Sequence, residues 1–300
     1  MWALVRATFS DWYEDRAPRM GAALAYYTIF ALTPGLVIVM GLAGFLLGPG
    51  AESQIIGQFR DLIGEQGAKA IEATVRSARA TTPGTAELFV VLATLILGLW
   101  GVFGELQDGL NTIWGVTPKP GRRVRDIVKE RFWSFTMVVG TGFLLLVSLV
   151  VSAWLAAMGT YVGYLLPAPA LALEALNSVI SLAVTTGAFA LIFKLLPDVR
   201  IAWRDVWLGA AVTSLLFTLG KFLIGLYIGK TAVASAYGAG GSLVVIVVWV
   251  YYSAQILLLG AEFTKVWTRR LGSGFKVEKT AKPVTAEARA EQGMGPKRRA

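Results

Sequence analysis

The stretch that decides the fold reads DVWLGAAVTSLLFTLGKFLIGLYIGK over 205–230, TAVASAYGAGG over 231–241 and SLVVIVVWVYYSAQILLLGAEFTK over 242–265. Two long apolar segments flank a short turn that is rich in glycine, alanine and serine. About 20 residues of helix are enough to cross a lipid bilayer. The stretch therefore predicts a hairpin of two transmembrane helices, over 206–228 and 242–264.

The composition of the whole chain agrees with a membrane protein. Hydrophobic residues make up 55% of the 300 residues and charged residues only 16%, whereas a soluble domain carries about 25% charged residues. The chain has no cysteine and no histidine. A Ser-His-Asp triad, a thiol nucleophile and the usual zinc ligands are thereby excluded. We expect a protein that is not an enzyme and that uses no cofactor or metal.

Other apolar segments predict four further spans, over 22–48, 86–106, 132–157 and 176–196, so that a six-helix, all-α membrane domain fills 22–271. Residues 1–21 place Trp2, Val5, Phe9 and Trp12 on one helical face, which is typical of an arm lying on the membrane surface. The polar segment 50–85 predicts two amphipathic helices outside the bilayer core, separated near Gly64 and Gly67. The range 272–300 lacks apolar periodicity and predicts a disordered, basic tail.

The basic residues predict the orientation of the spans. Of the 28 Lys and Arg residues, 22 fall on the side that holds both termini and five on the other side. Because cytoplasmic loops carry the excess of Lys and Arg, both termini are expected in the cytoplasm. The net charge of +9 is then mostly an orientation signal, and no nucleic-acid partner is expected.

Ionisable and amide side chains at membrane depth are the candidate contacts for a substrate. Counting along the helices predicts a cluster near the inner interface, and this cluster comprises Glu105, Asp108, Asn111, Lys194, Arg204 and Glu262. It could bind an ion or a polar headgroup, or it could be an ion-paired network that locks helix ends together. Lys221 could neutralise an anionic substrate or extend to the outer surface, and Gln255 could contact a solute or bond a neighbouring helix.

Four blocks of the sequence resemble the YihY/BrkB family of bacterial inner-membrane proteins. They are AALAYYTIFALTPGLVIV (22–39), FGELQDGLNTIWGV (103–116), WLGAAVTSLLFTLGKFLIGLYIG (207–229) and YGAGGSLVVIVVWVYYSAQILLLGAEF (237–263). The resemblance covers roughly residues 5–270, and it implies six spans with both ends in the cytoplasm. Some family members carry a ribonuclease label that is regarded as a misassignment, and others are described as virulence or serum-resistance factors.

The resemblance and the residues together favour a multi-pass protein of the bacterial plasma membrane that takes part in transport or export of a lipid-like or small polar solute. An envelope scaffold or assembly factor is one alternative. A membrane enzyme that acts on lipid or phosphate groups through Glu105, Asp108 or Glu262 is another. Membrane lipids are the expected partners, and a homo-oligomer stays open. The sequence does not specify the substrate.

Overall fold

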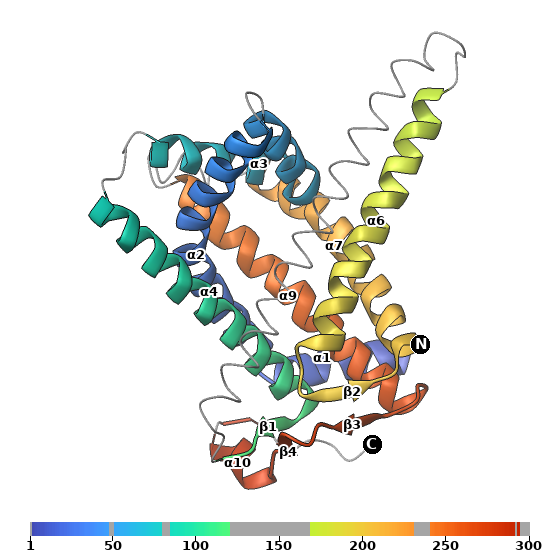
Figure 1. Cartoon of the computed structure of the whole chain (residues 1–300). Coiled ribbons are helices and arrows are strands. Elements are labelled where there is room, and N and C mark those ends of the chain that lie inside the picture. The colour runs from blue at the N-terminus through green and yellow to red at the C-terminus, as the bar shows by residue number, and fades with distance from the viewer. Residues whose placement is uncertain are drawn as a thin grey trace. The chain divides into compact units, whose positions relative to one another are not determined.

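The part of the chain that the structure describes is mostly helical, with four short strands (Figure 1). It comes from a computed structural model that describes residues 2–47, 51–79, 85–120, 169–230, 241–291 and 293–294. The elements are α1 (Trp2–Glu14), α2 (Ala17–Leu47), α3 (Ala51–Arg79), α4 (Thr85–Trp114), β1 (Val116–Pro118), α6 (Pro169–Leu195), β2 (Val199–Ile201), α7 (Trp203–Lys230), α9 (Gly241–Arg270), β3 (Phe275–Val277), β4 (Ala281–Pro283) and α10 (Ala286–Glu291).

Within the described ranges, four helices are long and apolar enough to cross a membrane. They cover Phe89–Trp114, Ser178–Leu195, Trp203–Tyr227 and Leu243–Arg270, and they match the spans predicted over 86–106, 176–196, 206–228 and 242–264. The span predicted over 22–48 falls in α2, which is not one of the four. The span predicted over 132–157 lies outside the described residues. The chain is thus an all-α membrane protein with four candidate spans in its described part.

The chain forms two compact units, which are described one at a time. Unit 1 comprises Met1–Asp11, Leu110–Leu216 and Leu259–Ala300, and unit 2 comprises Trp12–Gly109 and Phe217–Leu258. The division crosses α1, α4, α7 and α9, so each of these helices contributes one part to each unit.

In unit 2, α3 is one continuous helix that packs against α2, and the prediction of two separate amphipathic helices was wrong. Ile71 and Val75 of α3 form a buried cluster with Leu36 and Met40 of α2. A glycine inside a helix costs only about 1 kcal/mol, so Gly64 and Gly67 did not end it. Ion pairs also run through this region, from Arg60 to Glu65 at 2.7 Å and from Lys69 to Glu65 at 3.6 Å.

Small residues set a close approach between α2 and α4, also in unit 2. A Cβ atom added to Gly98 would lie 2.7 Å from the backbone nitrogen of Ala31, and one added to Gly101 would lie 2.2 Å from the ring of Tyr27. These contacts leave no room for a side chain. The pattern is the one expected between membrane helices, where small residues let backbones approach.

In unit 1, α7 and α9 interlock through two Gly-x-x-x-Thr sequences. A Cβ atom on Gly209 of α7 would lie 1.9 Å from the Thr264 hydroxyl oxygen of α9, and one on Gly260 of α9 would lie 2.0 Å from the Thr213 hydroxyl oxygen of α7. Each threonine hydroxyl donates to the carbonyl of the glycine four residues earlier, at 2.7 Å. Both threonines are fully buried, so the contact is dry and satisfies its own polar groups.

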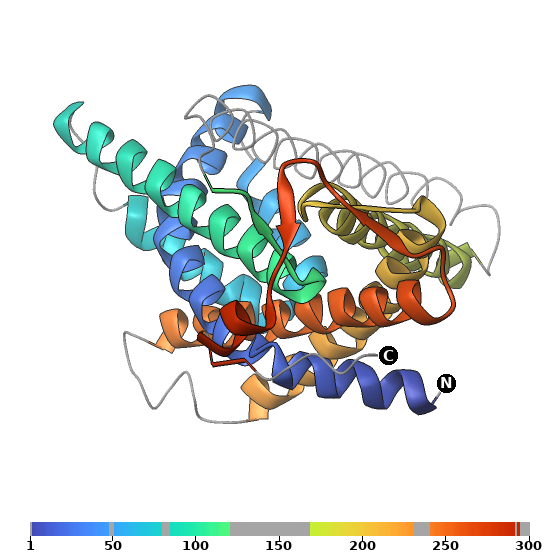
Figure 2. The same cartoon turned by 90° about the horizontal axis from the view of Figure 1, so that it is seen from below.

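The prediction of a disordered tail from residue 272 was wrong over most of its length. β3 pairs antiparallel with β2, and β4 pairs antiparallel with β1, which follows the end of α4 (Figure 2). Gly115, with a φ angle of 68°, ends α4 in the left-handed conformation that glycine favours, and its carbonyl accepts from the Val284 N–H at 3.0 Å. We call these two strand pairs the strand cap of unit 1.

Candidate functional site

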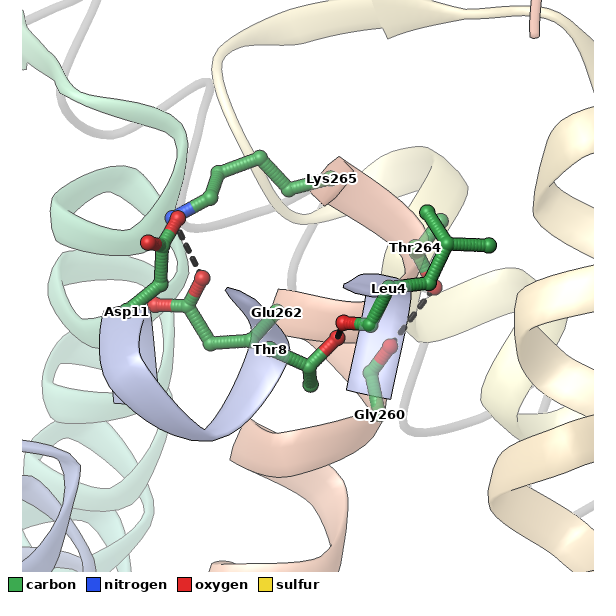
Figure 3. A network of polar contacts seen from close by, with 7 residues as sticks. All are labelled: Leu4, Thr8, Asp11, Gly260, Glu262, Thr264 and Lys265. Atoms are coloured by element: carbon green, nitrogen blue, oxygen red, sulfur yellow. Dashed lines mark hydrogen bonds and ion pairs between the residues drawn. The ribbon is translucent and has the colours of Figure 1, made fainter. Parts of the chain in front are cut away.

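A fully buried lysine occupies the last part of α9. The ammonium of Lys265 lies 2.9 Å from a carboxylate oxygen of Asp11 in α1, and it also contacts the carboxylate of Glu262, three residues earlier on α9. Lys265 and Glu262 are both 0% exposed, whereas the Asp11 side chain is 33% exposed. Figure 3 shows the lysine side chain reaching toward both carboxylates. All three residues belong to unit 1, and we call them the Lys265 network.

The sequence of α1 brings Asp11 to this network. Leu4, Thr8 and Asp11 are spaced at helical intervals and so share one face of α1, and Leu4 and Thr8 are buried. The Thr8 hydroxyl donates to the Leu4 carbonyl at 2.9 Å (Figure 3). The hydroxyl proton of Thr8 is therefore hydrogen-bonded although the side chain is buried. The carboxylate one turn further along meets Lys265.

The energetics of the network are those of a buried ion pair. Moving charges out of water costs several kcal/mol per ion, and only good geometry with a close partner offsets this cost. Two carboxylates around one ammonium leave the group with a net negative charge. The more exposed partner, Asp11, is the one that can exchange most easily with another anion.

A hydroxyl close to Lys265 in the sequence is also buried. Thr268 is 0% exposed, and its hydroxyl oxygen has no hydrogen-bond partner in the described part of the chain. It lies three residues after Lys265, on a neighbouring face of α9. It is a further polar group buried in this part of α9.

The other predicted inner-interface residues of unit 1 make separate local contacts. The Asn111 amide donates to Asp198 at 3.0 Å and accepts from the Asp198 backbone N–H at 2.8 Å. The Lys194 ammonium donates to the carbonyl of Ile201 and lies 5.4 Å from the ring centre of Trp203. Arg204 is exposed. These contacts tie helix ends to the connecting segments.

The remaining predicted residues lie in unit 2. Glu105 and Asp108 are one turn apart on α4, with Arg19 of α2 as a further charged neighbour of Glu105. Lys221 is partly buried. Gln255 packs against Gly21, where an added Cβ would lie 2.0 Å from the amide nitrogen, and both amide atoms are buried without a hydrogen-bond partner among the described residues.

Sequence reasoning missed Asp11 and Lys265. Lys265 follows the predicted span 242–264 and Asp11 precedes the first one, so neither stands among the candidates at membrane depth. A helical wheel of residues 2–14 would have shown Asp11 on the same face as Leu4 and Thr8. Asp205 was also missed as a buried contact, and its carboxylate accepts from the Ser273 N–H at 2.9 Å. No local pattern indicates that pairing.

No three His, Cys, Asp or Glu side chains of the described ranges gather as a metal site would require. The four candidate spans, together with buried charge at the end of one of them, define an all-α integral membrane protein.

The chain belongs to the family described as virulence factor BrkB, whose model matches residues 8–285. It is similar to the UPF0761 membrane protein of Pseudomonas aeruginosa strain LESB58, with 26% identity over 85% of this chain and 62% of the relative. Similar proteins of the same description occur in Azotobacter vinelandii, with 27% identity over 86% and 61%, and in Tolumonas auensis, with 27% identity over 84% and 81%. The chain thus spans about three-fifths of the first of these relatives. No solved structure matches it.

Proposed function

We propose that this chain takes part in the transport or export of a lipid-like or small polar solute that carries an anionic group. The proposal includes six spans in a bacterial plasma membrane, with both termini in the cytoplasm, as the distribution of Lys and Arg favours. The protein acts without enzymatic chemistry of its own.

The observation that carries the proposal is the burial of Lys265 between two carboxylates at the end of a candidate span. Ionisable groups at membrane depth are expensive, and they commonly mark substrate or ion pathways. A buried ion pair is also a weak source of stability, because apolar residues of similar volume often serve as well or better. A role in binding is therefore the stronger reason for a lysine at this position.

The proposed contact works by exchange. An anionic group approaches Lys265 from the side of Asp11, the partly exposed partner, and takes the place of its carboxylate. Glu262 stays paired with Lys265 throughout. Its negative charge lowers the affinity of Lys265 for the anionic group, so that the solute can dissociate again.

Reconstitution of the full chain into liposomes tests this function. One assay follows movement of a fluorescent anionic phospholipid between leaflets, and a second follows release of small anionic and neutral solutes from the lumen. We expect flux above that of protein-free liposomes in at least one assay, and a loss of most of it in Lys265→Gln. The matched control is Lys276→Gln, which removes an exposed lysine of the strand cap.

A scaffold in the envelope is the second candidate, and one observation favours it. Glu262 and Lys265 are both fully buried and paired next to the dry interlock of α7 and α9, which suits a rigid structural element. Absence of flux in both assays, with the protein folded and monodisperse, would favour the scaffold over transport.

A further inference from the structure

Helix α1 has its polar and apolar faces reversed relative to a helix on a water-soluble protein. Its protein-facing side carries Leu4, Thr8 and the carboxylate of Asp11, which pairs with Lys265. Its outward side exposes Trp2 to 80%, Phe9 to 54% and Val5 to 40%. A helix bordered by water would place its aromatic residues inward and its carboxylate outward.

We propose that the outward face of α1 is a docking surface for the headgroup layer of a lipid bilayer that contains anionic lipids. Large apolar side chains exposed in a row mark a surface that meets something other than water. Tryptophan and phenylalanine on one face of a short helix are the side chains that enter the boundary between headgroups and acyl chains.

Helix α1 contacts α9 at the level where the headgroup layer of a bilayer is expected. Asp11 meets Lys265, which lies five residues before the end of the candidate span Leu243–Arg270. In the same unit, Trp203 and Trp207 open another candidate span with about half of each side chain exposed. Exposed tryptophans at the end of a membrane helix belong to the aromatic belt at the membrane–water interface.

The charge of the outward face of α1 also fits a bilayer surface that contains anionic lipids. Arg6 falls on the outward face with Trp2, Val5 and Phe9 and is exposed, while Asp11 faces the protein and pairs with Lys265. The outward face of Trp2–Asp11 therefore carries positive charge only. Anionic headgroups attract basic residues close to the membrane surface.

The absence of native cysteine makes single-cysteine spin labelling a clean test. Full-length Phe9→Cys and Lys276→Cys are labelled and placed in liposomes of phosphatidylcholine with phosphatidylglycerol. At position 9 we expect collisions with oxygen to exceed those with a water-soluble nickel chelate, and the reverse at position 276. Val5→Cys is the second outward position, and it serves if the label at position 9 disturbs folding.

Three results would overturn the docking surface. Equal access of the nickel chelate at positions 9 and 276 means that the face meets water. Low access of both reagents at position 9, with spin–spin broadening at full labelling, means that a second copy covers it. Low access of both without broadening means that another protein surface does.

The anionic part of the proposal has its own control. Adding Arg6→Gln to Phe9→Cys should make the label shallower in liposomes with phosphatidylglycerol and leave it unchanged in pure phosphatidylcholine. The same depth with and without Arg6 in the anionic liposomes would overturn the role of headgroup charge. Neither measurement depends on solute flux, so this proposal can fail or stand independently of the transport function.

Discussion

Lys265 and Asp11 form an ion pair of 2.9 Å in which the lysine is fully buried and the aspartate side chain is one-third exposed. The two residues come from opposite ends of the chain, and their pairing holds α1 against α9. Because Glu262 also contacts Lys265, removal of the lysine and removal of Asp11 have different consequences.

Replacing Lys265 should destabilise the protein more than replacing Asp11. Lys265→Met leaves Glu262 buried without its cation, and removal of one member of a buried pair costs about 3–5 kcal/mol. Asp11→Asn leaves Lys265 paired with Glu262, and loss of a hydrogen bond to a charged group costs about 1.5–3 kcal/mol. Thermal unfolding in detergent, followed by circular dichroism, gives the order.

A double variant separates the ion pair from packing. Glu262→Gln combined with Lys265→Met should be less destabilised than Lys265→Met alone, because no buried charge then lacks its partner. A double variant that is as unstable as the sum of its single variants would show that shape, and not charge, governs this site.

Adding a single methyl group to a glycine at the contact between α7 and α9 should destabilise the protein. Gly209→Ala and Gly260→Ala each place a Cβ about 2 Å from a threonine hydroxyl oxygen, and overpacking of this kind costs about 1–3 kcal/mol. Gly187→Ala in α6 is the control, since an added Cβ meets nothing within 4 Å there, and it should be neutral or slightly stabilising. The melting temperatures of the purified variants test this order.

Rescue distinguishes a steric clash from a general helix effect. Thr264→Ala should restore part of the stability lost in Gly209→Ala, because it removes the hydroxyl oxygen and the methyl carbon that lie 1.9 and 2.9 Å from the new Cβ and leaves only the Cβ of residue 264, at 2.8 Å. It should do little for Gly260→Ala, whose clash is with Thr213. If Thr264→Ala rescued both glycine variants equally, the paired geometry would be wrong.

Asn111→Ala should loosen the segment between α6 and β2. The change removes two hydrogen bonds to Asp198 and leaves a buried carboxylate oxygen without this donor, at a cost of about 1–3 kcal/mol. The Asp198 carbonyl accepts from the Glu278 N–H at 3.0 Å, so β3 should also become more mobile. Hydrogen exchange of residues 199–201 and 275–277 measures both effects, and Thr185→Ala in α6 is a hydroxyl-deletion control.

The start of α10 should respond to acid. Hydrogen bonds from the Glu287 backbone and from Thr285 hold the pKa of the exposed Glu287 carboxyl below its usual value of 4.5, and Thr285 also accepts from the Ala288 N–H at 3.2 Å. A lowered pKa means that the contribution of Glu287 to stability is present above about pH 4.5. It is lost as the pH falls through the folded-state pKa.

Removing the Thr285 hydroxyl tests this assignment. In Thr285→Ala the pKa of Glu287 should rise toward 4.5, which a carbon-13 NMR titration of the labelled carboxyl group detects. Glu291→Gln, at the other end of α10, should leave the titration of Glu287 unchanged. An unaltered pKa in Thr285→Ala would contradict the proposed cause.

The sequence predicted the elements whose signals are long and local. The apolar runs over 86–106, 176–196, 206–228 and 242–264 correspond to candidate spans, because 20 apolar residues in a row have few other interpretations. The helix in residues 1–21 was also expected, and α1 covers Trp2–Glu14. Its place on the membrane surface stays a prediction. Trp12, expected on the outward face, is partly buried.

The errors have a common physical cause, which is that partners distant in sequence decide the structure. β3 and β4 are three residues long, too short for an alternating pattern, and they form because β2 and β1 supply their hydrogen bonds. α3 continues past Gly64 and Gly67 because α2 covers its apolar face. For the candidate site, Glu262 was found as an intramembrane charge, but its role depends on Lys265 and on α1.

The pairing of β1 with β4 has a consequence for biosynthesis. Val116 pairs with Pro283, 167 residues later in the chain, and ribosomes add about 5–20 residues per second. During synthesis, β1 therefore waits roughly 10–30 s for its partner, and β2 waits for β3 for part of that time. Chains released before β3 is made would carry two strands without their partners, and exposed strand edges promote aggregation. The pairing of β1 thus depends on synthesis of the chain as far as β4.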